Sequence, residues 1–402
     1  MQSDSGQGVF ARAQEFRRDE EARAVLGAYP FFQPISAFNG GTLQIEGREY
    51  LATGSNDYLG LSQAPEVKEA AQKAIEQYGT SCTGSRLLTG SLPIHAELEQ
   101  KMAAFLGKEA VLITSAGYLA SLSALSGLVD RNDIVYFDKD NHASLYDGAI
   151  LSGAKLRRYH HGRLDLLESY LQKDQGQKKG GKLIVVDGVF SMVGHIADLP
   201  TIVDLAEKYG AQILVDDAHA LGVLGDQGRG TANYFGLDER VDLYVGTFSK
   251  SLASVGGYIA GPAKVINYIR HSARPFLFNA AGPASQVAAA LKALELMQER
   301  PELLEKLWRN TFTFHQGLLD LGFDIMGTKT PVVPVLTGTL ELTAIFWKLL
   351  WDMQVFSTPS VPPGVPPGQC LIRASINASH TDAELAKLLT CFEDAGRQTE
   401  IL

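Results

Sequence analysis

The chain has 402 residues, 45% of them hydrophobic, which is enough apolar material for two or three domains with large cores. Its 36 Lys and Arg against 45 Asp and Glu leave a formal net charge of −9, so we expect neither nucleic acid nor an anionic membrane surface as a partner. The three cysteines, Cys82, Cys370 and Cys391, fit neither a disulfide framework nor zinc-ligand spacing, and we expect no metal site.

The first 45 residues are predicted to form an N-terminal helix and arm. Residues 1–23 are polar and charged where a signal peptide would carry an apolar core. No window reaches the roughly 18 apolar residues of a membrane span. We therefore expect a cytoplasmic protein without an integral membrane segment.

Between about residues 65 and 290, short apolar runs alternate with longer helical patterns, which is typical of βαβ units. Residues 65–78 form a clear helix, because Pro65 suits a first turn, apolar residues recur at helical spacing and Gly79 follows. Six short apolar runs are predicted as buried parallel strands: residues 110–114, 133–137, 182–186, 212–215, 243–245 and 257–260. This pattern predicts an α/β fold with a large domain over residues 46–290.

The pattern changes near residue 290. A long amphipathic helix over 286–298 is followed by charged helical segments, a Pro/Gly stretch over 358–368 and a last helix over 382–395. We predict a smaller C-terminal α/β domain over residues 291–402. The apolar run 344–355 has the helical spacing typical of core, with an acyl channel as the alternative.

Polar residues follow five of the predicted strands: Ser115, Asp138, Asp187, Asp216 and Thr247. Open α/β sheets bind ligands beyond the carboxyl ends of their strands, so we expect the chemistry along this edge. The glycine-rich run 222–230 does not lead from a strand into a helix, and there is no GxxxxGK[ST] motif. A nicotinamide or ATP site is therefore not expected.

The most informative motifs are Val-Asp-Asp-Ala-His at 215–219 and Gly-Thr-Phe-Ser-Lys at 246–250. A lysine among small residues can form a Schiff base beside a planar cofactor, and a buried aspartate can hold the proton of a pyridinium nitrogen. Alone, each motif is typical of a surface lysine or a satisfied carboxylate. Together they favour a pyridoxal 5′-phosphate site.

Two further motifs fit this cofactor. Ser-Ala-Gly-Tyr at 115–118 follows a strand and opens a helix, whose backbone N–H groups could cradle a phosphate. Asn-His-Ala-Ser at 141–144 follows another strand, where the imidazole of His142 could stack on the cofactor ring. The alternative is that His142 only caps a helix.

Taken in order, the motifs resemble those of the α-oxoamine synthases, fold-type I pyridoxal-phosphate enzymes that condense an amino acid with an acyl thioester. The resemblance covers nearly the whole chain and includes residues 55–61, 84–86, 95–99, 141–144, 188–192, 215–219 and 246–250. It implies a mostly parallel seven-stranded sheet in the large domain, a smaller C-terminal α/β domain, and a homodimer with its sites at the subunit interface.

The resemblance also implies roles for individual residues. Lys250 would be the Schiff-base lysine, Asp216 would contact the pyridine nitrogen and His142 would stack on the ring. His219 and Ser191 would lie near the phenolic oxygen. The phosphate would be held by four residues around one helix start: Ser115, Gly117, Tyr118 and Thr247. Arg373 would bind the amino-acid carboxylate, with two further candidates, Asn56 and Ser85, and no metal is implied.

Within the family, the segment 247–258 and the second acidic residue, Asp217, resemble bacterial serine palmitoyltransferases. This resemblance implies L-serine and a long-chain acyl thioester of coenzyme A or acyl carrier protein. Alternatives with the same chemistry are 8-amino-7-oxononanoate synthase, which joins alanine to a pimeloyl thioester, glycine C-acetyltransferase and a natural-product synthase. An aminotransferase and a non-catalytic partner subunit are alternatives of other classes.

Three features depart from the family pattern. Val193 and His195 stand where the family usually has acidic residues, and the segment 278–283 is one residue shorter than usual. A different substrate or acyl carrier would be a consequence of these departures.

Overall fold

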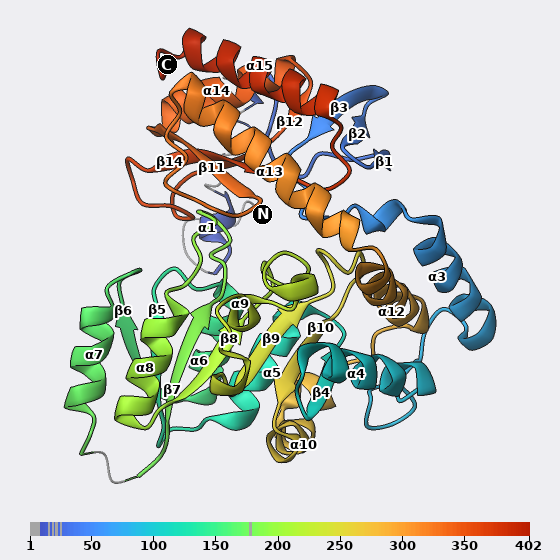
Figure 1. The fold of residues 1–402 in the computed structure, drawn as a ribbon, viewed down its shortest axis with the longest axis vertical. Coiled ribbons are helices and arrows are strands. Elements are labelled where there is room, and N and C mark those ends of the chain that lie inside the picture. The colour runs from blue at the N-terminus through green and yellow to red at the C-terminus, as the bar shows by residue number, and fades with distance from the viewer. Residues whose placement is uncertain (1–8, 15–16, 18–19, 21–22, 25, 177–178) are drawn as a thin grey trace, which may run out of the picture.

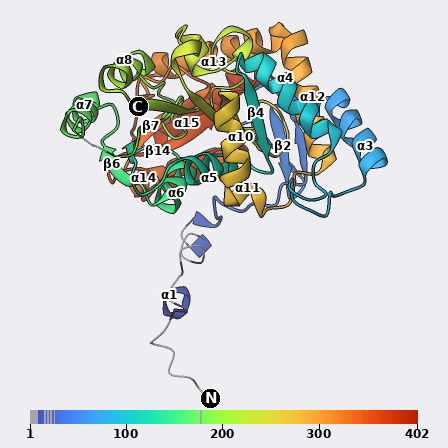
Figure 2. The same cartoon turned by 90° about the horizontal axis from the view of Figure 1, so that it is seen from below.

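The computed structural model describes residues 9–14, 17, 20, 23–24, 26–176 and 179–402. A seven-stranded sheet with its helices fills the lower half of Figure 1, and a smaller sheet with α14 and α15 lies above it. Of the predicted N-terminal helix and arm, residues 1–8, 15–16, 18–19, 21–22 and 25 lie outside the described residues. The described helix α1 (Ala11–Gln14) stands apart from the main body in Figure 2.

The large sheet has the strand order β4-β10-β9-β8-β7-β5-β6. Its strands are β4 (Ala110–Thr114), β5 (Ile134–Asp138), β6 (Lys155–Tyr159), β7 (Lys182–Asp187), β8 (Gln212–Asp216), β9 (Leu243–Thr247) and β10 (Gly257–Gly261). β10 runs antiparallel to both β4 and β9, whereas the pairs β9–β8, β8–β7, β7–β5 and β5–β6 are parallel. The predicted mostly parallel seven-stranded sheet is confirmed.

Six of these strands lie where the apolar runs predicted them, within one or two residues. The parallel orientation predicted for residues 257–260 is wrong, because β10 runs antiparallel to both of its neighbours. The seventh, β6, has the sequence Lys-Leu-Arg-Arg-Tyr, and only Tyr159 in it is buried. It is the edge strand beside β5, so most of its side chains face solvent. A search for buried apolar runs does not find such a strand.

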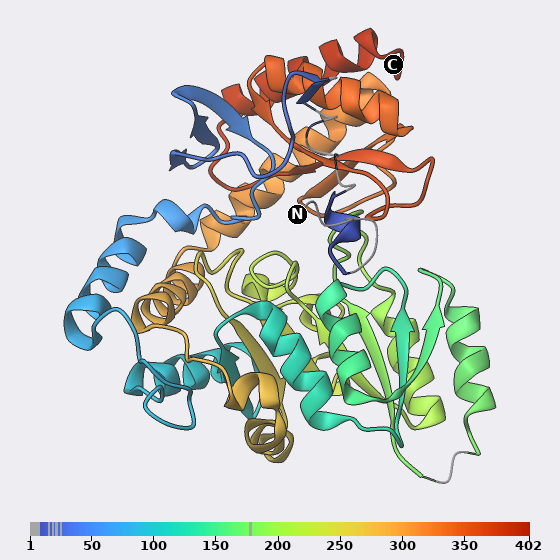
Figure 3. The same ribbon diagram turned by 180° about the vertical axis from the view of Figure 1, so that it is seen from behind.

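Alternate residues of each strand feed two separate cores, because successive side chains point to opposite faces of a sheet. In β5, Val135 and Phe137 pack with α5 (Gly117–Leu128), α6 (Ala143–Ser152) and α10 (Ala263–Ser272), which cross in front of the sheet in Figure 3. Ile134 and Tyr136 belong to the core on the other face. The helices that contribute to that core include α4 (Pro93–Leu106), α7 (Leu164–Lys173), α8 (Leu199–Tyr209) and α12 (Ala284–Glu299).

The helix predicted over residues 65–78 is confirmed as α3 (Pro65–Tyr78), and its Ala74 packs against Ala284 and Ala288 of α12. The remaining short helical elements are η1 (Leu61–Gln63), η2 (Asp226–Gly228), α9 (Thr231–Tyr234), η3 (Asp238–Arg240) and α11 (Arg274–Leu277). Across the described residues, none of the helices combines the length and apolar character needed to cross a membrane.

The C-terminal part has an antiparallel sheet of β11 (Val332–Gly338), β14 (Cys370–Ser375) and β13 (Thr358–Ser360), in that order. Helices α13 (Pro301–Leu321), α14 (Leu340–Asp352) and α15 (Asp382–Gln398) supply its core, in which Phe392 makes an edge contact with Phe314 and a tilted contact with Phe346. Trp347 is 1% exposed within this core. The structure therefore favours core over an acyl channel for the run 344–355.

A third sheet joins strands from the start of the described chain to a strand of the C-terminal part. β1 (Ala37–Asn39), β2 (Thr42–Ile45) and β3 (Arg48–Ala52) form an antiparallel meander, and β12 (Val355–Phe356) pairs in parallel with β3. Leu51 of β3 packs in the C-terminal core. We keep the division of the chain near residue 290 as a proposal, with the segment before α3 attached to the C-terminal part.

Candidate active site

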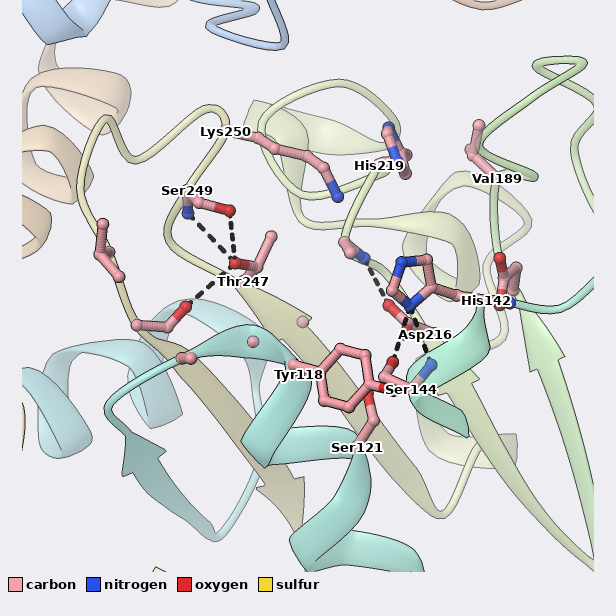
Figure 4. Close-up of a pocket in the computed structure, with 17 residues that line it drawn as sticks. Tyr118, Ser121, His142, Ser144, Val189, Asp216, His219, Thr247, Ser249 and Lys250 are labelled. Atoms are coloured by element: carbon pink, nitrogen blue, oxygen red, sulfur yellow. Dashed lines mark hydrogen bonds between the residues drawn. The ribbon is translucent and has the colours of Figure 1, made fainter. Parts of the chain in front are cut away.

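A pocket of about 360 Å³ lies beyond the carboxyl ends of β7, β8 and β9 (Figure 4). Seven residues predicted for the site line it: Gly117, Tyr118, His142, Asp216, His219, Thr247 and Lys250. Because β8 and β9 are neighbours in the sheet, their carboxyl ends bring Asp216, His219, Thr247 and Lys250 together, whereas Gly117 and Tyr118 come from the segment after β4 and His142 from the segment after β5.

Lys250 lies in the turn after β9, with its side chain reaching into the pocket (Figure 4). The pKa of its amine is lowered to about 8, chiefly by burial and also by the Arg373 charge, while Asp216 and Asp187 act in the opposite direction. An amine with this pKa is partly neutral near pH 7 to 8. It can therefore act as a nucleophile or a base.

Two carboxyl groups form the floor of the pocket at the ends of adjacent strands. Asp216 of β8 pairs in register with Asp187 of β7. Asp216 accepts a hydrogen bond from the Ala218 N–H at 2.9 Å, and Asp187 accepts one from the His142 N–H at 3.2 Å. Burial raises the pKa of both groups, and the neighbouring Asp216 raises that of Asp187 further. This floor is suited to holding a proton on a ring nitrogen.

His142 is the N-cap of α6 and also lines the pocket. Its Nδ1 accepts a hydrogen bond from the Ser144 N–H at 3.2 Å and lies 2.7 Å from Ser144 Oγ. Burial lowers the pKa of His142, so the ring is held neutral. The two interpretations of this residue, cap and ring contact, are thus compatible.

The opposite end of the pocket fits a phosphate group. Helix α5 starts there at Gly117 without a side-chain cap, so its first N–H groups are left for an anion. The approach is close, because a Cβ on Gly117 would lie 2.6 Å from the Cβ and Oγ1 of Thr247. Thr247 Oγ1 donates to the Gly256 carbonyl at 3.0 Å and accepts from the Ser249 N–H at 3.2 Å. Together with the amine and the carboxyl floor, this cradle fits pyridoxal phosphate.

Arg373, Asn56 and Ser191 form a second group beside the pocket. Arg373 Nη2 donates to Asn56 Oδ1 at 3.0 Å, and Arg373 Nε donates to the backbone carbonyl of Ser191 at 2.6 Å. Arg373 Nη1 donates to Ser375 Oγ at 2.9 Å. The guanidinium is 7% exposed and its charge acts on both Lys250 and His219. The contact of Ser191 is made by its carbonyl and not by its hydroxyl.

Five predicted residues do not line the pocket: Arg373, Asn56 and Ser191, which form the group just described, and Ser115 and Ser85. Ser115 Oγ accepts a hydrogen bond from Asn279 Nδ2 at 2.5 Å and borders a separate, smaller cavity. Ser85 forms an isolated β-bridge with Ala280. A phosphate contact for Ser115 and a substrate contact for Ser85 stay predictions.

Sequence reasoning gave no role to Tyr58 and Asp187. Tyr58 lies in the motif 55–61, and its hydroxyl is 2.7 Å from Nδ1 of His219. Asp187 was noted as a residue that follows a strand, which was the signal for its place in the pocket floor. Nothing in the sequence pattern indicates the contact of Tyr58, because it joins residues 161 positions apart.

A larger cavity of about 1110 Å³ adjoins the pocket and shares His142 with it. Its walls include Val193, Met192, Met326 and the proline-rich segment 362–367. On one wall, His161 lies between Asp138 and His195: its Nδ1 is 3.2 Å from Asp138 Oδ2, and its Nε2 is 3.3 Å from His195 Nδ1. Two of the departures from the family pattern, Val193 and His195, thus line this cavity.

Comparison with known proteins agrees with this geometry. Residues 48–392 match the aminotransferase class I and II family. A serine palmitoyltransferase of Sphingobacterium spiritivorum is 44% identical over 96% of both chains. The chain belongs to this family, and within it to the α-oxoamine synthases.

Two further comparisons support the assignment to the α-oxoamine synthases. An 8-amino-7-oxononanoate synthase of Bacillus velezensis is 41% identical over 92% of this chain and 94% of its own. A solved structure of serine palmitoyltransferase with pyridoxal phosphate superposes with a TM-score of 0.95 at 33% identity, over 98% of this chain and all of that one. The predicted fold-type I architecture, the pyridoxal-phosphate dependence and the transferase class of this α-oxoamine synthase are confirmed.

Proposed function

We propose that this α-oxoamine synthase condenses L-serine with a long-chain acyl thioester. The reaction releases carbon dioxide and the free thiol and gives a 3-ketosphinganine-type aminoketone. For the serine, the support is the 43–44% identity to several bacterial serine palmitoyltransferases over nine-tenths or more of the chain. Bound pyridoxal phosphate would supply an electron sink for the negative charge that develops at the amino acid's α-carbon.

The observation that carries the choice of a long acyl chain is the 1110 Å³ cavity that shares His142 with the cofactor pocket. Apolar side chains contribute much of its wall, among them Phe190, Met192, Val193, Met326, Val365 and Leu371. The short pimeloyl chain, which has seven carbons and ends in a carboxylate, would leave most of such a volume empty, whereas a long alkyl chain gains stability from each buried methylene, about 0.8 kcal/mol apiece.

Each residue then has a defined task. Lys250 Nζ, with its pKa near 8, accepts the proton from the α-carbon. With pyridoxal phosphate bound, Asp216 would hold the proton of the ring nitrogen, and His142 would cover one ring face. Arg373 binds the carboxylate through its guanidinium, which suits a bidentate contact. The N-terminus of α5 and Thr247 hold the phosphate.

We also propose that the protein acts as a cytoplasmic homodimer, with a thioester of coenzyme A or of acyl carrier protein as donor. Support for the dimer comes from apolar side chains exposed beside the site: Leu87 is 60%, Leu88 76% and Phe278 76% exposed. These residues flank the bridge between Ser85 and Ala280. A second subunit is the simplest cover for such a patch.

Product analysis tests the proposal. Purified protein is incubated with serine, alanine or glycine and with palmitoyl or pimeloyl thioester of either carrier, and products are identified by mass spectrometry. We expect the serine and palmitoyl pair to give the aminoketone with one thiol and one carbon dioxide per turnover. Preferential use of alanine with the pimeloyl thioester would instead assign the protein to oxononanoate synthesis.

A further inference from the structure

The phenol of Tyr58 connects the cofactor pocket of the large sheet to the C-terminal part of the fold. Tyr58 follows β3, in a segment attached to the C-terminal part of the fold, and it is 1% exposed. Its hydroxyl lies 2.7 Å from Nδ1 of His219, which follows β8 of the large sheet and is 8% exposed. A contact this short between two buried polar groups is a full hydrogen bond, and the tautomer of His219 decides its direction.

We propose that Tyr58 is a positioning residue: its hydroxyl donates to His219 Nδ1 and so keeps the ring's single proton on Nε2, where it faces the cofactor pocket. The proposal extends the proposed function at the same pocket. It does not depend on which amino acid or acyl chain is used.

The neighbours of the phenol set the direction of this hydrogen bond. The guanidinium of Arg373, whose charge acts on Tyr58, can only donate. Asn56 Oδ1 is 3.5 Å from the hydroxyl and already accepts from Arg373 Nη2 at 3.0 Å and from Ser375 Oγ at 3.3 Å. The imidazole nitrogen at 2.7 Å is therefore the best acceptor for the phenolic proton.

The charge state of His219 determines how many protons its ring carries, and the phenol determines which nitrogen holds the proton. Burial lowers the pKa of His219 well below its usual value, and the charges of Lys250 and Arg373 lower it further. The ring is thus neutral, and a neutral ring whose Nδ1 accepts must carry its proton on Nε2. Burial also raises the pKa of Tyr58 to about 12, so the phenol retains its proton at neutral pH.

The surroundings of His219 Nε2 are consistent with a proton on that nitrogen. Within the described residues, Nε2 of His219 has no hydrogen-bond partner, and His219 lines the pocket near Lys250 (Figure 4). A fixed Nε2–H is a preorganised donor for an anionic oxygen of whatever occupies the pocket. Without the phenol, the ring could adopt either tautomer, and only one of them offers this donor.

The test is solid-state ¹⁵N NMR of the full-length holoenzyme labelled at histidine. The signals of His219 are obtained as the difference between wild type and His219→Gln, because the chain has nine histidines. We expect a neutral ring protonated at Nε2 in the wild type, and a population of the Nδ1-protonated tautomer in Tyr58→Phe. A wild-type ring protonated at Nδ1, or an unchanged tautomer in Tyr58→Phe, would overturn the proposal.

A matched control removes another buried phenol. Tyr159 is fully buried at the end of β6, and within the described residues its hydroxyl has no hydrogen-bond partner. Tyr159→Phe should leave the His219 signals and the pH dependence of the cofactor's visible absorbance unchanged, whereas Tyr58→Phe should shift that pH dependence. A shift of equal size in both variants would mean that Tyr58 acts only through packing.

The wild-type spectrum decides the tautomer even if Tyr58→Phe does not fold. The measurement is also separate from the product assay. A protein that fails to condense serine but shows the Nε2 tautomer would reject the proposed substrate and retain the positioning role. The reverse combination would retain the function and reject the role of Tyr58.

Discussion

The cofactor pocket and the Arg373 group lie next to each other but are assembled in different ways. The pocket takes most of its polar side chains from the ends of adjacent strands in one sheet, among them Asp187, Asp216 and Thr247. The Arg373 group joins three segments that are far apart in the chain, and Arg373 and Asn56 are 317 positions from each other. The chemistry of the first region is thus fixed by one element of the fold, whereas the second depends on how the C-terminal part meets the large sheet.

The largest effect on activity is expected from removing the lysine amine of the cofactor pocket. Lys250→Ala should lower the turnover rate by about 10³-fold or more, because the residue is both the attachment point and the base. It should also abolish the visible absorbance of the bound cofactor. Circular dichroism and the melting temperature should stay close to wild type, because the Lys250 amine makes no hydrogen bond within the described residues.

Lys208→Ala is a control for that variant, because Lys208 forms a surface ion pair with Glu168. It should retain colour and activity. A yellow, active Lys250→Ala protein would show that the amine of another residue carries the chemistry.

In the second region, Arg373→Lys keeps the positive charge but loses the planar fork. We expect the KM for the amino acid to rise by about 10- to 100-fold, the range for losing a charged hydrogen bond of roughly 1.5–3 kcal/mol. The affinity for pyridoxal phosphate should change little, because Arg373 does not line the cofactor pocket. Steady-state kinetics and a cofactor titration separate the two, and an unchanged KM would reject the carboxylate role.

The larger cavity offers a test of the acyl chain. Val193 lines this cavity and packs with Met192, Met326 and Leu371. Val193→Trp should lower the rate with palmitoyl thioester by about 10-fold and spare shorter donors, because a lost methylene contact costs about 0.8 kcal/mol and about two would be lost. Rates measured across a series of chain lengths give the answer. An equal loss for all lengths would point to a general disturbance of the fold.

The difference between these two regions also explains which parts of the fold and of the site could be predicted from the sequence. The strands after which Asp187, Asp216 and Thr247 stand are apolar and buried, so their ends, and the pocket floor, were visible as changes from apolar to polar residues. The strand β6 was missed because Lys155, Arg157 and Arg158 leave it without an apolar run. The local pattern determines a buried strand but not an exposed edge.

The sequence pattern also did not predict contacts between segments that lie far apart in the chain. Asn56 and Arg373 were found only through the family resemblance, and the contact of Tyr58 with His219 was not found at all. His142 shows the opposite case, since its capping of α6 is local and could be weighed from four residues of sequence. The interactions that require the two parts of the fold to meet carry no short-range signal.

The smallest expected effect concerns the pair His161 and His195, which also connects the two parts. His195 Nε2 lies 2.8 Å from the Met326 carbonyl, and Nδ1 of His161 lies 3.2 Å from Asp138 Oδ2. Burial alone would lower the pKa of His161, but the Asp138 carboxylate outweighs it and the pKa is raised above the usual 6.5. The folded state therefore binds this proton more tightly than the unfolded chain does.

The resulting stability is fully present below about pH 6.5 and is lost as the pH rises through the higher pKa of folded His161. We expect the free energy of unfolding to fall over that window by up to about 1 kcal/mol more in the wild type than in His161→Gln, the scale of one partly exposed charged pair. Urea unfolding at pH 6 and pH 8 measures the difference.

His271→Gln is the control, because His271 is exposed on α10 and bonds only to the Asn267 carbonyl among the described residues. If His161→Gln and wild type lost equal stability between the two pH values, the Asp138 carboxylate would not be holding a proton on this imidazole.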